Sequence, residues 1–285
     1  MRLVVTGAGG MVGSEVSRQA PDRGWDCVAF TRAQLDLAQD DAVFTAIGSA
    51  KPDVIINAGA YTAVDRAEAD EDKATLVNGH GAANVARAAH AAGAAMIHIS
   101  TDYVFDGEAN EPYRPSDRTN PINAYGRSKL AGEIKVRSAC PRHLIVRTSW
   151  VYSHDGQNFV RTMLRLGAAG NELKVVDDQH GSPTCAADIA GALITAAEAM
   201  CKNTSVTGTY HFANSGVTTW YDFARTIFEM RGLNVPVQPI STAEYPTTAR
   251  RPLWSVLDCT SFETDFGVTP RPWQAALRET LDRIQ

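Results

Sequence analysis

The sequence has few cysteines and no C-x-x-C pair. Its five cysteines are Cys27, Cys140, Cys185, Cys201 and Cys259. An odd number at such wide spacing argues against a disulfide framework or a zinc knuckle, so we interpret them as buried free thiols. The seven histidines show no H-x-x-x-H or H-E-x-x-H spacing, so we expect no metal site.

Long apolar runs and an excess of basic charge are also missing. No stretch reaches about 18 uninterrupted apolar residues, so we expect no membrane-spanning helix. The 32 acidic residues outnumber the 27 basic ones, which argues against nucleic acid as a main partner. The first residues, MRLVVTGAGG, carry glycines where a signal peptide would have its apolar core, so we expect a cytoplasmic protein.

Short apolar runs alternate with longer segments of helical period. The expected strands centre on residues 3–5, 27–30, 54–56, 96–99 and 144–146, and helices are predicted over 74–92 and 125–138. Such alternation predicts an α/β fold, with a doubly wound, Rossmann-like parallel sheet covered on both faces. Runs of Val and Ile without polar alternation fit strands that are buried on both faces.

The alternation of apolar runs and helical segments becomes less regular after residue 150, where Thr, Pro and aromatic residues become more frequent. We expect residues 1–150 to form a dinucleotide-binding domain, with 172–202 returning to it. Residues 151–285 would mainly form a smaller C-terminal substrate-binding lobe that shares a cleft with the first domain.

A glycine-rich loop directly follows the first expected strand. In Thr6-Gly7-Ala8-Gly9-Gly10-Met11-Val12-Gly13, glycines 7, 10 and 13 allow a tight turn, a close approach to a pyrophosphate and close packing of helix on sheet. The following helix start offers free N–H groups to the phosphates. The strand–loop–helix context predicts a dinucleotide site that includes Gly7, Gly10, Met11, Val12 and Gly13.

The end of the second strand bears on the choice of dinucleotide. Phe30-Thr31-Arg32 has no carboxylate that would hold the ribose 2′-OH of NAD, and Arg32 is suited to pair a 2′-phosphate. We therefore favour NADPH, with NADH as the alternative. Arg32 as a solvated loop charge is the competing interpretation. Asp36 and Leu37 are expected beside the adenine.

Hydroxyl, phenol and ammonium groups form the candidate catalytic set. Ser100-Thr101-Asp102 ends the strand at 96–99, and strand carboxyl ends line the ligand crevice in sheets of this kind. Tyr125 and Lys129 are four residues apart and therefore share one helix face. We expect the Lys129 ammonium to lower the pKa of the Tyr125 phenol and to hold the nicotinamide ribose, while Thr101 orients the substrate oxygen.

These motifs carry a resemblance to a known family. With T-G-x-x-G-x-x-G at 6–13 and Y-x-x-x-K at 125–129, the chain resembles the extended short-chain dehydrogenase/reductases. Within them it is similar to the reductases that act on dTDP-4-dehydro-β-L-rhamnose. Further matching stretches span nearly the whole chain, at residues 57–65, 100–107, 147–152, 178–184, 218–221 and 249–252.

The resemblance implies a function and further site residues. It implies NAD(P)H-dependent reduction of the C4 keto group of dTDP-4-dehydro-β-L-rhamnose to dTDP-β-L-rhamnose, the last step of dTDP-rhamnose synthesis. Residues implied to contact the cofactor are Gly10, Met11, Val12, Ala60, Tyr61, Thr62, Tyr125 and Lys129. Those implied to contact the sugar nucleotide are Thr101, Asp102 and Trp150. To these we add Gln179, whose amide suits a polar edge, and Arg250 and Arg251, which suit a diphosphate or base, with surface charge as the alternative.

Several alternatives stay open. Another nucleotide-sugar 4-ketoreductase or an epimerase would use the same residues, and a regulatory subunit could keep the fold without turnover. A dehydratase is disfavoured because Tyr103 stands where such enzymes resembling this fold carry Glu. Some members of the family dimerise through magnesium held by glutamates. Glu15 matches one of these, but Ala187 falls where another is expected, so we expect no metal and no metal-bridged dimer, while a homodimer stays open. The acidic run 65–72 is interpreted as a solvated face with no assigned role.

Overall fold

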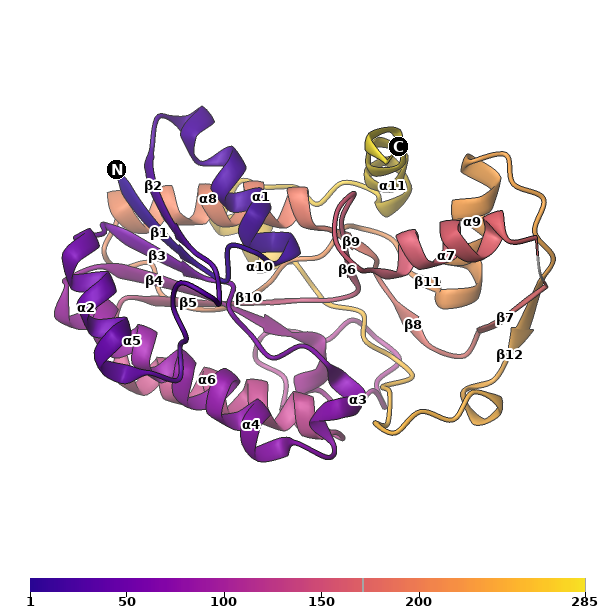
Figure 1. Ribbon diagram of the computed structural model, residues 1–285, viewed down its shortest axis with the longest axis horizontal. Helices are drawn as coiled ribbons and strands as arrows, with labels where there is room; N and C mark the ends of the chain where they lie inside the picture. Colours follow the sequence, from indigo (N-terminus) through magenta and orange to yellow (C-terminus); the bar gives the residue numbers. More distant parts are fainter. Residues whose placement is uncertain (171, 285) are drawn as a thin grey trace.

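A six-stranded parallel sheet forms the centre of the molecule in the computed structural model, which describes residues 1–170 and 172–284. Its strands are β1 (Arg2–Thr6), β2 (Asp26–Phe30), β3 (Val54–Asn57), β4 (Ala95–Thr101), β5 (His143–Thr148) and β10 (Gly208–His211). They lie in the order β10-β5-β4-β3-β1-β2 (Figure 1). The five strands predicted from apolar runs are all present, and the predicted α/β fold class is confirmed.

Side chains of the central strands alternate between two cores. In β1, for example, Leu3 and Val5 pack on one face of the sheet and Val4 on the other. Because both faces are covered, every residue of β3 is buried, which explains why these strands read as continuous apolar runs.

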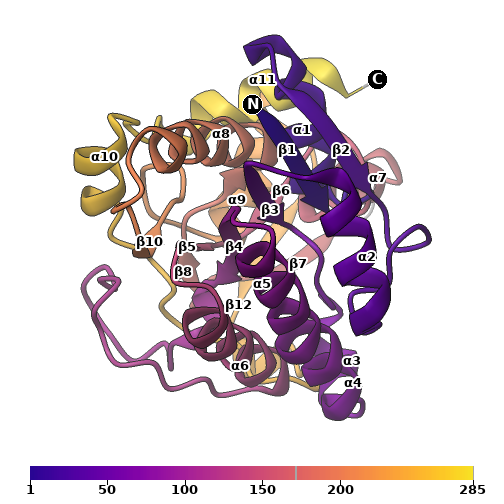
Figure 2. The ribbon, with the colours of Figure 1, turned by 90° about the vertical axis from the view of Figure 1, so that its left-hand side faces the viewer.

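Two layers of helices cover the sheet. The helices α1 (Met11–Gln19), α8 (Ala186–Lys202) and α10 (Thr260–Phe266) pack on one face, and α2 (Asp40–Ala50), α5 (Ala82–Ala91) and α6 (Ala124–Ala139) pack on the other. Figures 1 and 2 show the sheet between these layers. No helix within the described ranges is long and apolar enough to cross a bilayer.

The helical segment predicted over 74–92 is present, and it contains a π-helical turn that the sequence did not indicate. After α3 (Val64–Ala67), the chain forms α4 (Glu71–Thr75), the π-helical turn (Leu76–Gly81) and then α5. The π turn brings the backbone close to α6, where a Cβ on Gly132 would lie 2.2 Å from the carbonyl oxygen of Asn78. A π turn leaves no apolar period in the sequence, and such turns often mark functional sites.

A smaller lobe lies beyond the carboxyl ends of the strands (Figure 1). It contains α7 (Phe159–Ala168) and α9 (Trp220–Met230), and α11 (Trp273–Arg283) joins their apolar core. Its short strands pair as β6 (Val151–Tyr152) with β9 (Thr184–Cys185), β7 (Leu173–Val176) with β12 (Val237–Ile240), and β8 (His180–Gly181) with β11 (Thr218–Thr219). Within residues 1–170 and 172–284, 3₁₀ turns also occur at Pro21–Arg23, Asp102–Val104 and Thr242–Glu244.

The segment expected to return to the first domain is divided between the two parts. Helix α8 covers the large sheet, because its Ala, Ile and Leu face is buried against β1, β3 and β4. Strand β7, in contrast, pairs with β12 and packs Val175 into the core of the smaller lobe. Strand β10, from the part expected to form that lobe, pairs with β5 at the edge of the large sheet.

Candidate active site

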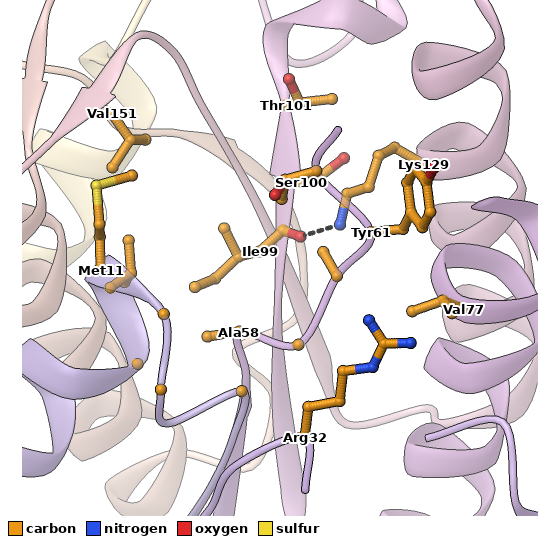
Figure 3. Close-up of a pocket in the computed structure, with 18 of the residues that line it drawn as sticks. Met11, Arg32, Ala58, Tyr61, Val77, Ile99, Ser100, Thr101, Lys129 and Val151 are labelled. Atoms are coloured by element: carbon orange, nitrogen blue, oxygen red, sulfur yellow. Dashed lines mark hydrogen bonds between the residues drawn. The ribbon is translucent and has the colours of Figure 1, made fainter. Parts of the chain in front are cut away.

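One cavity of about 840 Å³ lies at the carboxyl ends of β1, β3 and β4. Figure 3 shows side chains converging on it from opposite sides. Every residue predicted to bind cofactor lines it, namely Gly7, Gly10, Met11, Val12, Gly13, Arg32, Asp36, Leu37, Ala60, Tyr61, Thr62, Tyr125 and Lys129. Of the residues predicted to bind substrate, Thr101, Asp102 and Trp150 also line it.

The glycine loop has room for backbone only. Gly7 has φ +73°, and a Cβ there would lie 2.4 Å from the Gly59 nitrogen. A Cβ on Gly13 would lie 2.3 Å from the Gly7 carbonyl oxygen. Helix α1 begins at Met11 without a side-chain cap, so its first N–H groups face the cavity. This cradle fits the pyrophosphate of a dinucleotide.

Two segments shape the part of the cavity next to this loop. Arg32, after β2, is exposed, and its guanidinium extends into the cavity toward Val77 (Figure 3). Leu37 is buried beneath the loop, and a Cβ on Gly59 would lie 2.6 Å from its side chain. At this distance glycine fits where a Cβ would meet the Leu37 side chain.

A buried polar chain supports the floor of the cavity. The Thr6 hydroxyl donates to the Asn57 carboxamide oxygen at 2.7 Å, and the Asn57 amide lies 3.1 Å from Nδ1 of His98. The same Asn57 oxygen accepts the Gly59 N–H at 3.2 Å. Burial holds the pKa of His98 well below its usual value, so this histidine is neutral. It is a core residue, as its place in a strand predicts.

Thr101, Tyr125 and Lys129 meet at the end of β4. The Lys129 ammonium donates to the Ile99 carbonyl oxygen at 2.6 Å, which is the dashed bond in Figure 3. The Thr101 hydroxyl donates to Asp102 Oδ1 at 2.9 Å, and its oxygen accepts the Tyr103 N–H at 3.2 Å. Tyr125 packs edge-to-face on Tyr103, with ring centroids 5.6 Å apart. The structure therefore brings Thr101, Tyr125 and Lys129 to one cavity, as their positions in the sequence predict.

The expected pKa of Tyr125 is wrong in sign. Burial and the nearby Asp102 charge raise the pKa of Tyr125 above its usual value. The Lys129 ammonium does not offset this effect, because it is turned to the Ile99 carbonyl, and burial lowers the pKa of Lys129 itself to about 8. A phenol with its usual pKa near 10 is already protonated at neutral pH, and the raised pKa of Tyr125 extends the protonated state to higher pH.

Asp102 is a buried carboxyl group in the same corner. Only 2% of the residue is exposed, and its Oδ2 has no hydrogen-bond partner among the described residues. Burial raises the pKa of Asp102 to about 7. A titratable group with a pKa near neutrality at the edge of a cavity is typical of a functional site.

Asn78 is a site residue that the sequence did not reveal. From the π turn, its carboxamide bonds both the N–H and the carbonyl of Tyr61, at 2.8 and 3.0 Å. Its amide also donates to the Ser128 hydroxyl at 2.9 Å. Asn78 thereby connects the 60–62 segment to helix α6 between Tyr125 and Lys129. An apolar-period argument cannot find such a residue, because the bonds join segments far apart in the chain.

Trp150 is held in a strained backbone conformation. Its φ of +47° is rare for a residue with a side chain. The indole stacks on Trp220 with centroids 3.6 Å apart, and it lies so close to Gly181 that a Cβ there would be 2.4 Å from the ring. Strain of this kind persists where the surroundings fix it and often marks a ligand site.

The remaining candidates lie outside the cavity lining. Gln179 is buried and donates to the Thr242 hydroxyl at 2.9 Å. Arg250 is exposed, and its carbonyl accepts the Asn123 amide. Arg251 forms an ion pair with Asp65 at 2.6 Å and lies over the Tyr103 ring, with its guanidinium carbon 5.9 Å from the centroid. Because Tyr103 lines the cavity, Arg251 is the nearer of the two arginines to it.

Glu15, the residue that matched a magnesium ligand, lies among cations. It is 2% exposed and pairs with Arg18 at 2.5 Å and with Arg283 at 3.3 Å. Within the described residues no group of three or more His, Cys, Asp and Glu side chains is arranged to hold a metal ion. The absence of a bridging metal stays a prediction.

The parallel sheet, the glycine loop and the Thr101–Tyr125–Lys129 group around one cavity define an extended short-chain dehydrogenase/reductase. A family model described as RmlD substrate binding domain matches residues 1–285. The chain belongs to this family, and its relatives include dTDP-4-dehydrorhamnose reductases. The resemblance seen in the sequence is therefore confirmed.

Three relatives illustrate the similarity. A dTDP-4-dehydrorhamnose reductase of Sinorhizobium fredii is 46% identical over 99% of this chain and 97% of its own. A solved dTDP-4-dehydrorhamnose reductase of Clostridium acetobutylicum is 41% identical, has a TM-score of 0.94 and covers 99% of both chains. Another, from Bacillus anthracis in complex with NADP, is 38% identical with a TM-score of 0.94 and covers 99% of this chain and 98% of its own.

Proposed function

We propose that the chain reduces the C4 keto group of dTDP-4-dehydro-β-L-rhamnose to dTDP-β-L-rhamnose with NADPH. The observation that carries this proposal is the single cavity that joins the glycine cradle to Thr101, Tyr125 and Lys129. Relatives named for this reaction at 38–46% identity support it.

The proposed chemistry divides into a hydride and a proton. The bound dinucleotide supplies the hydride to C4. The Thr101 hydroxyl orients the keto oxygen, and the protonated Tyr125 phenol donates the proton to that oxygen as the C–O double bond becomes single. Lys129, on α6 and bonded to the Ile99 carbonyl of β4, would hold the ribose and keep the reacting atoms in line.

We propose NADPH as the preferred cofactor, with NADH as a weaker one. Arg32 extends its guanidinium into the cavity beside the glycine loop, where it suits a 2′-phosphate. The relative from Bacillus anthracis was solved with NADP.

The two parts of the chain would divide the ligands between them. We propose that residues 1–150, with α8, bind the dinucleotide, and that the smaller lobe binds the sugar nucleotide. Trp150 would supply an aromatic wall, and Arg251 a cation for the diphosphate. Gln179 and Arg250 are not part of the cavity lining, so we assign them no contact with the sugar nucleotide.

The test is turnover of the defined substrate. Purified protein with dTDP-4-dehydro-β-L-rhamnose should consume NADPH, and NMR of the product should show dTDP-β-L-rhamnose. The other C4 epimer would indicate a reductase of a different deoxysugar. Consumption of neither reactant, despite NADPH binding, would favour a regulatory subunit.

We also propose that the enzyme is cytoplasmic. A homodimer, if formed, would not be bridged by metal, because Arg18 and Arg283 form ion pairs with Glu15 and neutralise its charge.

A further inference from the structure

The acidic run at 65–72 is not simply a solvated face. Asp65, Glu68 and Glu71 are three residues apart, and each forms hydrogen bonds with a segment beside the cavity. The carboxylates of their neighbours Asp70 and Asp72 make no hydrogen bond or ion pair within the described ranges. The run therefore contains bonded and free acids side by side.

Glu68 holds the first residue of the helix that carries Tyr125 and Lys129. Its Oε1 accepts the N–H of Ala124 at 2.7 Å. Ala124 is the first residue of α6, so this N–H has no partner inside the helix. A carboxylate at a helix N-terminus is favoured by the helix dipole as well as by the hydrogen bond.

Glu71 holds the same helix from the side. Its two carboxylate oxygens accept two hydrogen bonds from Arg127, both at 2.7 Å. Hydrogen bonding from Arg127 holds the pKa of Glu71 below its usual value, so the pair is charged at neutral pH. Arg127 lies midway between Tyr125 and Lys129, and a two-point bond fixes direction as well as distance.

The other end of this acidic segment joins the cofactor side of the cavity. Residues 60–62, which line the cavity, come directly before α3. Asp65, at the start of α3, accepts the Ala249 N–H at 3.0 Å and pairs with Arg251. One short segment thus touches the 60–62 loop, the start of α6 and residues 249–251, where Arg251 lies over the Tyr103 ring.

We propose that Glu68 is a positioning residue for Tyr125 and Lys129, with Glu71 as a second anchor through Arg127. Glu68 fixes where α6 begins, one residue before Tyr125, and Glu71 fixes the rotation of the helix. This inference rests on the proposed reduction, because it assigns the two glutamates an effect on the same turnover.

The experiment compares variants that differ only in the bond. Glu68→Gln keeps an oxygen for the Ala124 N–H, whereas Glu68→Met removes it at similar size. Glu71→Ala removes the two hydrogen bonds with Arg127. Asp72→Ala is the control, because it removes a neighbouring exposed carboxylate that makes no side-chain hydrogen bond within the described ranges. A Glu71→Arg, Arg127→Glu double variant restores the pair in reverse.

The expected result is a loss of kcat without a loss of fold. Glu68→Met should lower kcat about 10- to 100-fold, because a displacement of about 1 Å has this cost, while KM for the sugar nucleotide changes less than about threefold. Glu71→Ala should lose less, since the pair is about half exposed and contributes little to stability. Glu68→Gln, Asp72→Ala and the reversed pair should keep most of the wild-type rate, and all variants should melt within about 2 °C of wild type.

A second readout does not depend on turnover. Hydrogen exchange of the backbone amides at 124–129 should rise in Glu68→Met and stay at the wild-type level in Asp72→Ala. If wild type fails to reduce any dTDP-4-keto sugar, the proposed function is wrong, and exchange alone decides the positioning claim. Equal kcat in Glu68→Met and Asp72→Ala, or unchanged exchange at 124–129, would overturn the inference.

Discussion

The Lys129 ammonium is bonded to the carbonyl oxygen of Ile99, 2.6 Å away, near the carboxyl end of strand β4. This bond ties helix α6, which also carries Tyr125, to the central sheet. Lys129 and Tyr125 both line the cavity, and burial raises the pKa of the Tyr125 phenol above its usual value.

The first prediction concerns pH. Burial lowers the pKa of Lys129 to about 8, so its charge is lost as the pH rises through that value. The value of kcat/KM for NADPH should fall above pH about 8, because this ratio reports groups of the free enzyme. The Lys129→Met variant should have a low kcat/KM at every pH, and this ratio should show no decrease near pH 8. If kcat/KM of the variant still decreases near pH 8, another group is responsible for the decrease.

The second prediction concerns the cost of keeping Asp102 buried. Its pKa is raised to about 7 in the folded protein against about 4 for an unfolded carboxyl, so the folded state binds the proton more tightly. This contribution to stability is present at low pH and is lost as the pH rises through about 7. Asp102→Asn should therefore gain melting temperature over wild type, more at pH 8 than at pH 5. An equal gain at both values would show that Asp102 does not titrate in this range.

The third prediction concerns the choice of cofactor. Arg32→Ala should weaken NADPH far more than NADH, because only NADPH carries the 2′-phosphate. Loss of a charge-assisted bond corresponds to about ten- to hundredfold in affinity. The measurement is a fluorescence titration of each cofactor, with Arg66→Ala as an exposed control outside the cavity lining. Equal weakening of both cofactors would show that Arg32 is a solvated loop charge.

The fourth prediction concerns the wall formed by Trp150. In Gly181→Ala the new Cβ would meet the indole at 2.4 Å, so the ring must leave its stack on Trp220. We expect KM for the sugar nucleotide to rise and kcat to fall, together costing at least about tenfold in kcat/KM, with NADPH affinity unchanged. Gly48→Ala is the matched control, because a Cβ there meets nothing within 4 Å. Normal kinetics in Gly181→Ala would remove Trp150 from the substrate site.

The sequence predicts features that depend on neighbours along the chain. The strands, the glycine loop and the i, i+4 pair Tyr125–Lys129 each arise from a local pattern, and the structure contains them all. The sign of the Tyr125 pKa depends on burial, which spacing does not contain.

Contacts between distant segments could not be predicted in this way. Glu68 meets Ala124 across 56 residues, and Asp65 meets Arg251 across 186. The π turn that carries Asn78 packs against α6, and Trp150, with its left-handed backbone, packs against Gly181. Both features depend on these distant contacts, so no local sequence pattern predicts them.

The most direct test of the account is the turnover of dTDP-4-dehydro-β-L-rhamnose by wild type and by Tyr125→Phe with NADPH. The account predicts that wild type forms dTDP-β-L-rhamnose, and that the variant binds NADPH normally but has a kcat lower by about 10²- to 10⁴-fold, the usual contribution of a proton donor. A Tyr125→Phe enzyme that turns over at nearly the wild-type rate would contradict the central claim that this phenol donates the proton.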